Sequence, residues 1–295
     1  MKLKKILLVV SIFLVNWTYA QQPIFTQYYF NPIYTNPAFT GNAYCLSLKA
    51  QYRNMWTGFE SSPISTLVTA HSPIGLSSSS LGISIYNDNF ALTKNTGAII
   101  SYAYRFQTKI GRIVAGTHFN AENYKQSLTE SKPYNSFDPA LLSNVNKTIF
   151  NFGLGVAWEN ENGYVGIAVP KIIRNYLSET DSTSTSGTVV QMNVTGVYTI
   201  QLNSKWKITP SVLYKYVAST PSQLDMQVHL LFDEQVQFDA GFRSNSTYIA
   251  GVQYKLKNKF TFGYSYDYDN SSFGSTTGGS HEVLLGYDFY KPEGE

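Results

Sequence analysis

The sequence predicts an all-β protein, namely a transmembrane antiparallel β-barrel of the bacterial outer membrane with about fourteen strands. Apolar and polar residues alternate with period 2 along most of the chain, which is the pattern of strands with one apolar face. These segments are longer than the roughly 5 or 6 residues of a soluble strand, and they match the roughly 9 to 11 that span a bilayer. Aromatic residues make up 15% of the chain and charged residues only 14%, against about 25% charged in soluble domains.

The first 20 residues have the pattern of a secretory signal peptide. Three lysines precede an apolar run over residues 6–15, and small residues stand at the two positions that a signal peptidase reads, Thr18 and Ala20. Removing residues 1–20 takes away three of the 22 Lys and Arg residues and none of the 19 acidic ones. The mature chain then has no net formal charge, so it lacks the basic excess expected of a nucleic-acid-binding protein.

Residues 21–44 form a separate N-terminal segment. This segment is rich in Tyr, Asn and Pro and has no strand pattern. Small residues such as Gly155, Gly241 and Gly263 on the polar strand faces leave volume in the lumen, and a barrel of about 14 strands is wide enough to need something in it. We therefore expect residues 21–44 to be periplasmic or to plug the lumen.

The barrel itself is expected over residues 45–290, with a short tail over 291–295. The clearest strand carries Phe150, Phe152 and Leu154 on one face and Asn151 and Gly153 on the other. The expected strands span 45–53, 64–72, 80–88, 98–107, 110–121, 149–159, 163–170, 189–200, 205–217, 222–232, 235–243, 247–255, 259–268 and 282–290. Because Pro210 lacks the N–H of a ladder bond, we expect a bulge or a strand end there.

The connections alternate in length. Short turns follow the even-numbered strands, whereas long connections follow several odd-numbered ones, at 54–63, 87–97, 122–148, 171–188 and 269–281. In outer-membrane barrels the short turns face the periplasm and the long loops face outward. This parity places both termini in the periplasm, and the loops over 122–148 and 178–188 are expected to be the largest external surfaces.

The sequence contains no recognisable pattern of catalytic or metal-binding residues. His71, His118, His229 and His281 each lack a second His or Cys at ligand spacing, and no common catalytic or phosphate-binding motif occurs. Asp267 and Asp269 are interpreted as the edge of a loop, and the single Cys45 cannot form an internal disulfide. We therefore expect no enzyme activity, no cofactor and no metal.

The beginning of the mature chain is its most distinctive part. Residues 22–63 carry a Q-x-x-Q-Y-x-x-N pattern, then N-P-A-aromatic-x-G, then Y-R-x-x-W. The matching residues are Gln27, Tyr28, Asn31, Asn36, Pro37, Ala38, Gly41, Tyr52, Arg53 and Trp56. This region resembles the PorP/SprF family of type IX secretion system membrane proteins, although Phe39 stands where the family usually has Tyr.

The resemblance implies an outer-membrane barrel that assists the export or surface anchoring of large adhesins, in some members for gliding motility. It also implies that the partners are type IX secretion components, the C-terminal signal domains of adhesins and outer-membrane lipid. The motif residues have two interpretations. They either dock the N-terminal segment into the barrel, with Arg53 stacking on Trp56 or pairing with a lumen acid, or they form a surface for a secretion partner.

A second functional hypothesis concerns transport. A fourteen-stranded barrel with an N-terminal plug is also the plan of long-chain fatty acid transporters, so a transporter of small apolar molecules is the alternative. The motif at 22–63 favours the secretion component, whereas an apolar internal pocket would favour the transporter.

Overall fold

The computed structural model describes residues 25–75, 78–130, 144–175, 190–218, 220–257 and 259–289. The expected signal peptide, the tail over 291–295 and the loop over 178–188 lie outside these residues. In the described part of the chain no helix is long and apolar enough to cross a membrane.

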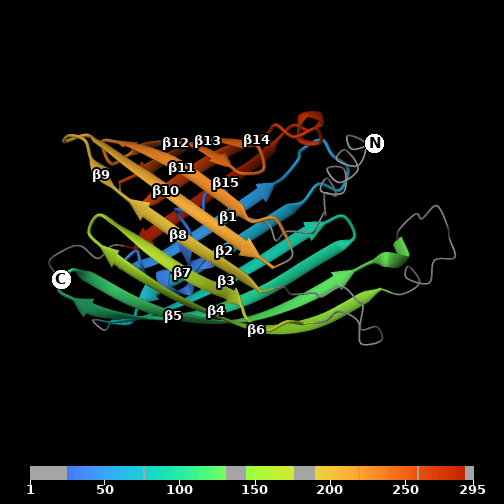
Figure 1. Ribbon diagram of the computed structural model, residues 1–295, viewed down its shortest axis with the longest axis horizontal. Coiled ribbons are helices and arrows are strands. Elements are labelled where there is room, and N and C mark those ends of the chain that lie inside the picture. The colour runs from blue at the N-terminus through green and yellow to red at the C-terminus, as the bar shows by residue number, and fades with distance from the viewer. Residues whose placement is uncertain are drawn as a thin grey trace, which may run out of the picture.

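The described residues form a closed antiparallel barrel of 14 strands (Figure 1). The first half of the wall comprises β1 (Leu46–Asn54), β2 (Ile64–Pro73), β3 (Ser79–Phe90), β4 (Thr93–Thr108), β5 (Gly111–Gln126), β6 (Val145–Asn160) and β7 (Gly163–Lys171). The second half comprises β8 (Gln191–Tyr198) continued by β9 (Ile200–Gln201), β10 (Trp206–Val217), β11 (Gln223–Phe232), β12 (Val236–Arg243), β13 (Thr247–Leu256), β14 (Phe260–Asp269) and β15 (Ser280–Phe289). Short 3₁₀ turns are η1 (Pro32–Tyr34), η2 (Pro37–Phe39), η3 (Leu128–Glu130) and η5 (Gly274–Thr276).

The barrel closes where its first and last strands meet. β15 pairs with β1 from Leu46↔Phe289 to Asn54↔His281. We call this pairing the seam. Every other strand pairs with its neighbour in sequence, β8 and β9 acting as one wall strand beside β10. Among the strands of the described residues no edge is left open, which is the condition for a sheet that spans a bilayer.

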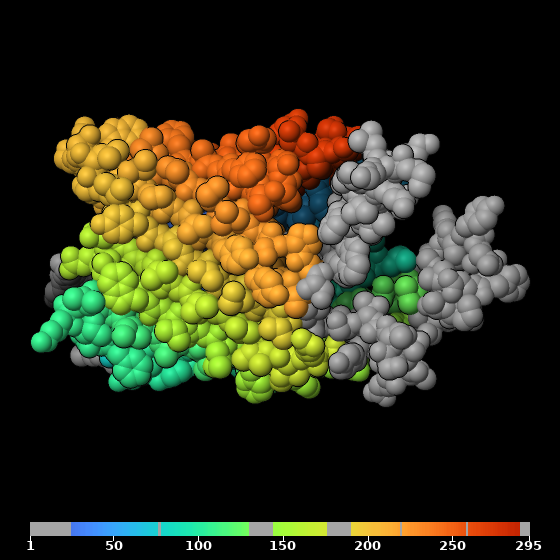
Figure 2. Space-filling model, viewed as in Figure 1, coloured from blue at the N-terminus to red at the C-terminus, as the bar shows by residue number. Residues whose placement is uncertain are grey.

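The alternation of side chains follows the prediction, with the apolar face outward. Phe150, Phe152, Leu154 and Val156 on β6 are each about half exposed, and this outer wall is seen in Figure 2 over the green and yellow strands. The buried residues are mostly polar or charged. Such an inverted arrangement is stable only when lipid covers the outer face and the polar groups pair with one another in the lumen.

Turn lengths separate the two ends of the barrel. We call the end with turns 74–78, 109–110, 161–162, 202–205, 233–235 and 257–259 the short-turn end, and the opposite end, with connections 55–63, 127–144, 172–190 and 270–279, the long-loop end. The expected long connection over 87–97 is wrong. Residues on both sides of Ala91 and Leu92 pair from Asn87↔Thr96 to Phe90↔Thr93, forming a tight hairpin. The connection expected over 122–148 is also shorter, because β5 continues to Gln126 and β6 begins at Val145.

Pro210 interrupts the ladder as expected, but without a bulge. Its position faces Tyr198, where β8 ends, and the same register resumes at Ile200. A register shift occurs instead between Ala168 and Lys171, next to Pro170. The missing N–H of each proline accounts for both irregularities.

Candidate functional site

Residues 25–42, which we call the lumen segment, lie inside the barrel. Each of them is buried or half-buried, and Figure 1 shows the blue chain running between the strands. Two Asn-Pro pairs shape the segment, because Pro32 and Pro37 each begin a 3₁₀ turn. The side chain of Asn36 accepts a hydrogen bond from Ala38 N (2.9 Å) and so caps the second turn. Gly41 has φ +75°, a left-handed conformation that glycine adopts without the steric cost of a Cβ.

The lumen segment crosses the barrel from one end to the other. Thr26 contacts Asp267 and Glu282, near the long-loop ends of β14 and β15. The carbonyl oxygen of Thr40 accepts a hydrogen bond from Arg105 at the short-turn end. Phe25 and Phe289 therefore lie at opposite ends of the barrel. Strand parity alone does not reveal this crossing.

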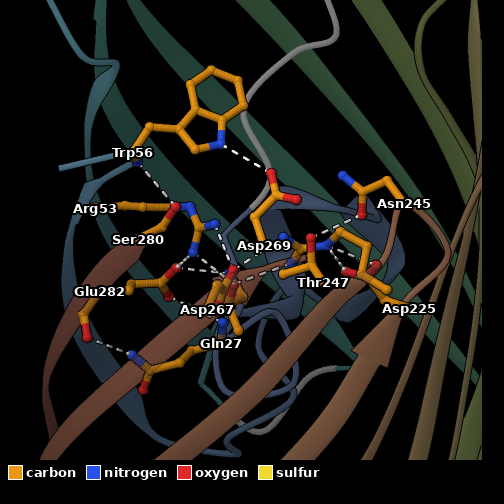
Figure 3. Close-up of polar contacts among 12 residues, drawn as sticks. Gln27, Arg53, Trp56, Asp225, Asn245, Thr247, Asp267, Asp269, Ser280 and Glu282 are labelled. Carbon is orange, nitrogen blue, oxygen red and sulfur yellow. Dashed lines mark hydrogen bonds and ion pairs between the residues drawn. The ribbon is translucent and has the colours of Figure 1, made fainter. Parts of the chain in front are cut away.

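A buried ionic cluster holds the beginning of the lumen segment (Figure 3). Arg53 Nη2 lies 2.6 Å from Asp267 Oδ2, and Arg53 Nη1 lies 3.1 Å from Glu282 Oε2. Arg243 bridges Asp225 (2.8 Å) and the same oxygen of Asp267 (3.0 Å). The five residues come from β1, β11, β12, β14 and β15, and all are at least nine-tenths buried. We call them the ionic cluster.

The lumen segment completes this cluster. Glu282 accepts hydrogen bonds from the backbone N–H groups of Thr26 (2.7 Å) and Gln27 (3.0 Å). The hydroxyl of Thr26 donates to Asp267 (2.7 Å) and accepts from Arg53 (2.6 Å). The cluster has three carboxylates and two guanidinium groups, so the donors of the segment supply what the arginines lack. Buried charges are tolerated only when they are well paired and hydrogen-bonded. In this cluster Arg53 Nε and Asp267 Oδ1 are left without a hydrogen-bond partner among the described residues.

Further contacts continue along the seam. Asn31 Nδ2 donates to Gln51 Oε1 (2.7 Å), and Gln51 Nε2 in turn donates to Glu282 (3.2 Å). Thr69 donates to Asn31 Oδ1 (3.0 Å), and Lys49 Nζ donates to the carbonyl of Phe30. The first half of the segment is thus bound to the strands on either side of the seam, and it also accepts hydrogen bonds from Gln227 on β11 and Gln253 on β13.

A second polar cluster lies at the short-turn end. Arg105 and Arg112 both pair with Glu159 Oε1, at 3.2 and 3.0 Å. The hydroxyl of Tyr44 donates to the same oxygen (2.7 Å), and the Tyr44 ring lies 4.9 Å from the Arg112 guanidinium. Burial and the Glu159 carboxylate raise the pKa of Tyr44 to about 12, so its hydroxyl remains a donor. These contacts hold the chain where it leaves the lumen.

Glycines in the wall make room for the lumen segment. A Cβ added at Gly116 would lie 2.6 Å from Ala38 Cα and closer still to Ala38 N. A Cβ at Gly155 would overlap the side-chain amide of Asn36. A Cβ added at Gly82, Gly166 or Gly263 would likewise come too close to the side chain of Ile33, Asn36 or Gln27, respectively. The volume that small inward residues were expected to leave is therefore occupied by the chain itself.

A row of three hydrogen-bonded side chains, one each from β10, β11 and β12, also contacts the segment. Ser211 Oγ lies 2.9 Å from His229 Nε2, and His229 Nδ1 lies 2.7 Å from Asp239 Oδ1. This order of groups resembles a hydrolase triad, but the hydroxyl of Tyr28 is bonded to Ser211 (3.1 Å) and the ring of Tyr29 stacks on His229 at 4.3 Å. In the structure this row of side chains serves to hold Tyr28 and Tyr29.

Eight of the ten motif residues meet at the boundary between the segment and the wall, and Tyr52 and Trp56 lie elsewhere. The residues that contact each other across this boundary, or shape the segment there, are Gln27, Tyr28, Asn31, Asn36, Pro37, Ala38, Gly41 and Arg53. Trp56 lies just above the ionic cluster, and its Nε1 donates to Asp269 (3.3 Å). Tyr52 points outward and is 45% exposed. Arg53 pairs with lumen acids, which was one of the two expected arrangements.

Sequence reasoning missed several residues of this site. Thr26, Arg243, Asp225 and Glu282 were not singled out, and the interpretation of Asp267 as a loop edge is wrong because it faces the lumen from β14. A signal was available. Charged residues on the polar face of a lipid-enclosed strand must find partners. The charged residues of the ionic cluster all lie near the same end of their strands, so they could have been expected to pair.

A cavity of about 50 Å³ lies on the long-loop side, between Tyr34 and the wall residues Asn120, Lys171 and Asn193. This volume holds a few water molecules. Among the described residues, no three His, Cys, Asp or Glu side chains are placed to bind a metal.

The closed sheet, the apolar outer wall and the polar lumen define an outer-membrane β-barrel protein. The model of the family described as "Type IX secretion system membrane protein PorP/SprF" matches residues 18–287. The chain therefore belongs to the PorP/SprF family, as the motif predicted.

A solved structure supports the fold. The outer membrane protein Omp33 of Acinetobacter baumannii is similar, with a TM-score of 0.51 and 11% identity over 83% of this chain and 98% of that chain. A FadL homologue of Pseudomonas aeruginosa has a TM-score of 0.49 and 12% identity over 86% and 93% of the two chains. No curated protein sequence matches this chain.

Proposed function

We propose that this protein is a non-enzymatic component of the type IX secretion system that assists the export or surface anchoring of large adhesins through protein–protein contacts. Membership of the PorP/SprF family supports the secretion role. The observation that carries the mode of action is the occupied lumen. Because residues 25–42 fill the barrel, the surfaces left for a partner are the two ends and the outer wall.

The packing of the lumen argues against a constitutive pore. A barrel of fourteen strands encloses more space than its own wall side chains fill, and residues 25–42 occupy part of that space. The cavity beside Tyr34 has a volume of about 50 Å³. Its lining includes Lys171, Lys215 and Asn193, which suits water better than an apolar solute. The apolar-transporter alternative therefore gains no support from this cavity.

We assign the short-turn end to the periplasm and the long-loop end to the cell exterior, following the usual orientation of such barrels. Phe289 then lies at the periplasmic end and Phe25 at the outer end. The connections 55–63 and 270–279 meet at the outer end, where the Phe273 ring lies 5.3 Å from the rings of both Trp56 and Phe59. Phe59 and Phe273 are each more than 40% exposed, and this aromatic surface is a suitable contact for the C-terminal domain of a secreted adhesin.

The test is deletion of the gene, followed by mass spectrometry of the surface and secreted proteins. Loss of one or a few large adhesins, restored by the wild-type gene, is the expected result for a dedicated export partner. Loss of every type IX substrate would instead make the protein a core component of the machine. An unchanged secretome, together with reduced uptake of apolar solutes, would contradict the proposal and favour transport.

A further inference from the structure

The lumen segment is hydrogen-bonded to both strands that meet last, in addition to its contacts with the rest of the wall. β1 and β15 are the first and last strands of the barrel, and their pairing at the seam closes it. Arg53 on β1 and Glu282 on β15 are direct register partners there. The backbone N–H groups of Thr26 and Gln27 bind the Glu282 carboxylate, and the hydroxyl of Thr26 binds Arg53. The segment therefore bridges the seam from the inside.

Glu282 depends on this bridge. Its side chain is fully buried, and its hydrogen-bond donors are Arg53 and Gln51 from β1 and Thr26 and Gln27 from the lumen segment. Without the segment, β15 would bring a buried carboxylate to β1 with half of its donors missing. Leaving a buried charge with too few partners is strongly unfavourable, so pairing of the last strand is favoured only when the segment is already in place.

The path of the chain gives an independent argument about order. The segment is joined to β1 at the short-turn end, and its first described residue, Phe25, lies at the long-loop end. Insertion after closure would require the free end of the chain to pass through the whole barrel. The wall glycines Gly116 and Gly155 leave no space beside the segment even for a Cβ. The strands can enclose the segment more readily than the segment can enter the closed barrel.

We propose that the lumen segment is the internal template on which the barrel closes. It first binds β1 and β2 through Asn31 and its neighbours. It then recruits β15 by presenting the N–H groups of Thr26 and Gln27 to Glu282. Filling the lumen is the final state of this process, and closing the seam is a separate function of the same residues.

The test follows seam formation during refolding of the mature chain into detergent micelles. Ala50 and Leu285 are register partners at the seam, and in the strand alternation they face the lipid. Cysteines at these two positions, in a chain that also carries Cys45→Ser, form a disulfide only when the seam has paired. The rate of this crosslink is compared between that parent and chains that add Thr26→Val or Glu282→Gln.

Glu122→Gln is the matched control. Glu122 is also a buried wall carboxylate, but its partners Lys171, Tyr86 and Asn120 are all wall residues. Glu282→Gln replaces one carboxylate oxygen with an NH2 group that cannot accept a hydrogen bond from the segment or from Arg53. Thr26→Val keeps the backbone N–H but removes the hydroxyl that bonds to Asp267 and Arg53. Each substitution is expected to slow the crosslink about tenfold. Glu122→Gln is expected to leave the rate within about twofold, since its contacts do not involve the seam. Equal rates in Glu282→Gln and Glu122→Gln would overturn the proposal.

A second measurement keeps the proposal testable if a variant does not fold. Ala38 is completely buried in the lumen, so a cysteine there becomes protected from a maleimide pulse when the segment docks. In an otherwise wild-type lumen with Cys45→Ser, we expect protection of Ala38→Cys before or together with the seam crosslink. Protection that develops only after the crosslink is complete would show that the segment enters a closed barrel, and the template would be refuted.

Discussion

The substitution Gly116→Ala tests whether the lumen segment is tightly packed against the wall. The added Cβ would lie 2.6 Å from Ala38 Cα, and closer to Ala38 N and Pro37 C, whereas carbon atoms in contact are separated by about 3.5 to 4.0 Å. The segment would have to move by roughly 1 Å, and the neighbouring wall cannot retreat because its strands are fixed by ladder bonds. Overpacking of this kind costs about 1 to 3 kcal/mol.

A second estimate of the cost of Gly116→Ala gives a similar value. If the segment undocks around η2 instead of shifting, Phe39 loses its packing against Ala103, Val114 and Tyr164. Exposing a buried aromatic side chain costs about 1.5 to 3 kcal/mol. We therefore expect Gly116→Ala to lower the free energy of unfolding by about 2 kcal/mol.

The control is Gly286→Ala, another wall glycine whose added Cβ has Thr261 Cβ as its nearest neighbour, at 3.3 Å, and meets no atom of the segment. Its cost is expected to stay below about 1 kcal/mol. Urea unfolding in liposomes measures both values, and limited proteolysis with mass spectrometry reports cleavage within residues 25–42. Equal stability and equal protection in the two variants would refute the packing described here.

Other substitutions test separate parts of the account. Arg53→Met leaves two buried carboxylates without their shared cation and is expected to cost about 3 to 5 kcal/mol in denaturant unfolding, whereas Arg112→Met, at a side chain 28% exposed, should cost no more than about 1 kcal/mol. Tyr44→Phe removes a hydrogen bond to a carboxylate and should cost about 1 kcal/mol by the same assay; no loss would mean that this contact does not hold the chain. Phe152→Arg places a charge on the lipid face and should cost about 2 to 4 kcal/mol for folding into bilayers, so an unchanged folding yield would argue against a membrane-facing wall.

The barrel was predictable because lipid imposes a simple rule. Each outward residue within the bilayer has to be apolar, so strands such as β6, with Phe150, Phe152 and Leu154, show their period directly in the sequence. The rule fails outside the bilayer. In the hairpin that was mistaken for a loop, Thr96 and Asn87 point outward and bond to each other (2.8 Å). Strands of 16 residues, such as β4, are longer than the bilayer requires, and their ends carry no apolar signal.

The site was predictable only in part. The motif drew attention to Gln27, Asn31 and Arg53, and the turn chemistry of Asn36 and Gly41 follows from their residue types. The partners Glu282 and Arg243 could not be paired with them, because they lie more than 180 residues away in the sequence. A segment without periodicity also gives no indication of its direction through the lumen. The crossing from one end of the barrel to the other emerged only from the contacts at both ends.

Conductance of the purified wild-type protein in planar lipid bilayers tests the central claim most directly. The account holds that the chain's own residues 25–42 fill the lumen and that the protein acts through its surfaces. It predicts no steady, porin-sized conductance from the wild-type barrel. A stable open conductance of that size would contradict the account, because ions could then pass where the lumen segment lies.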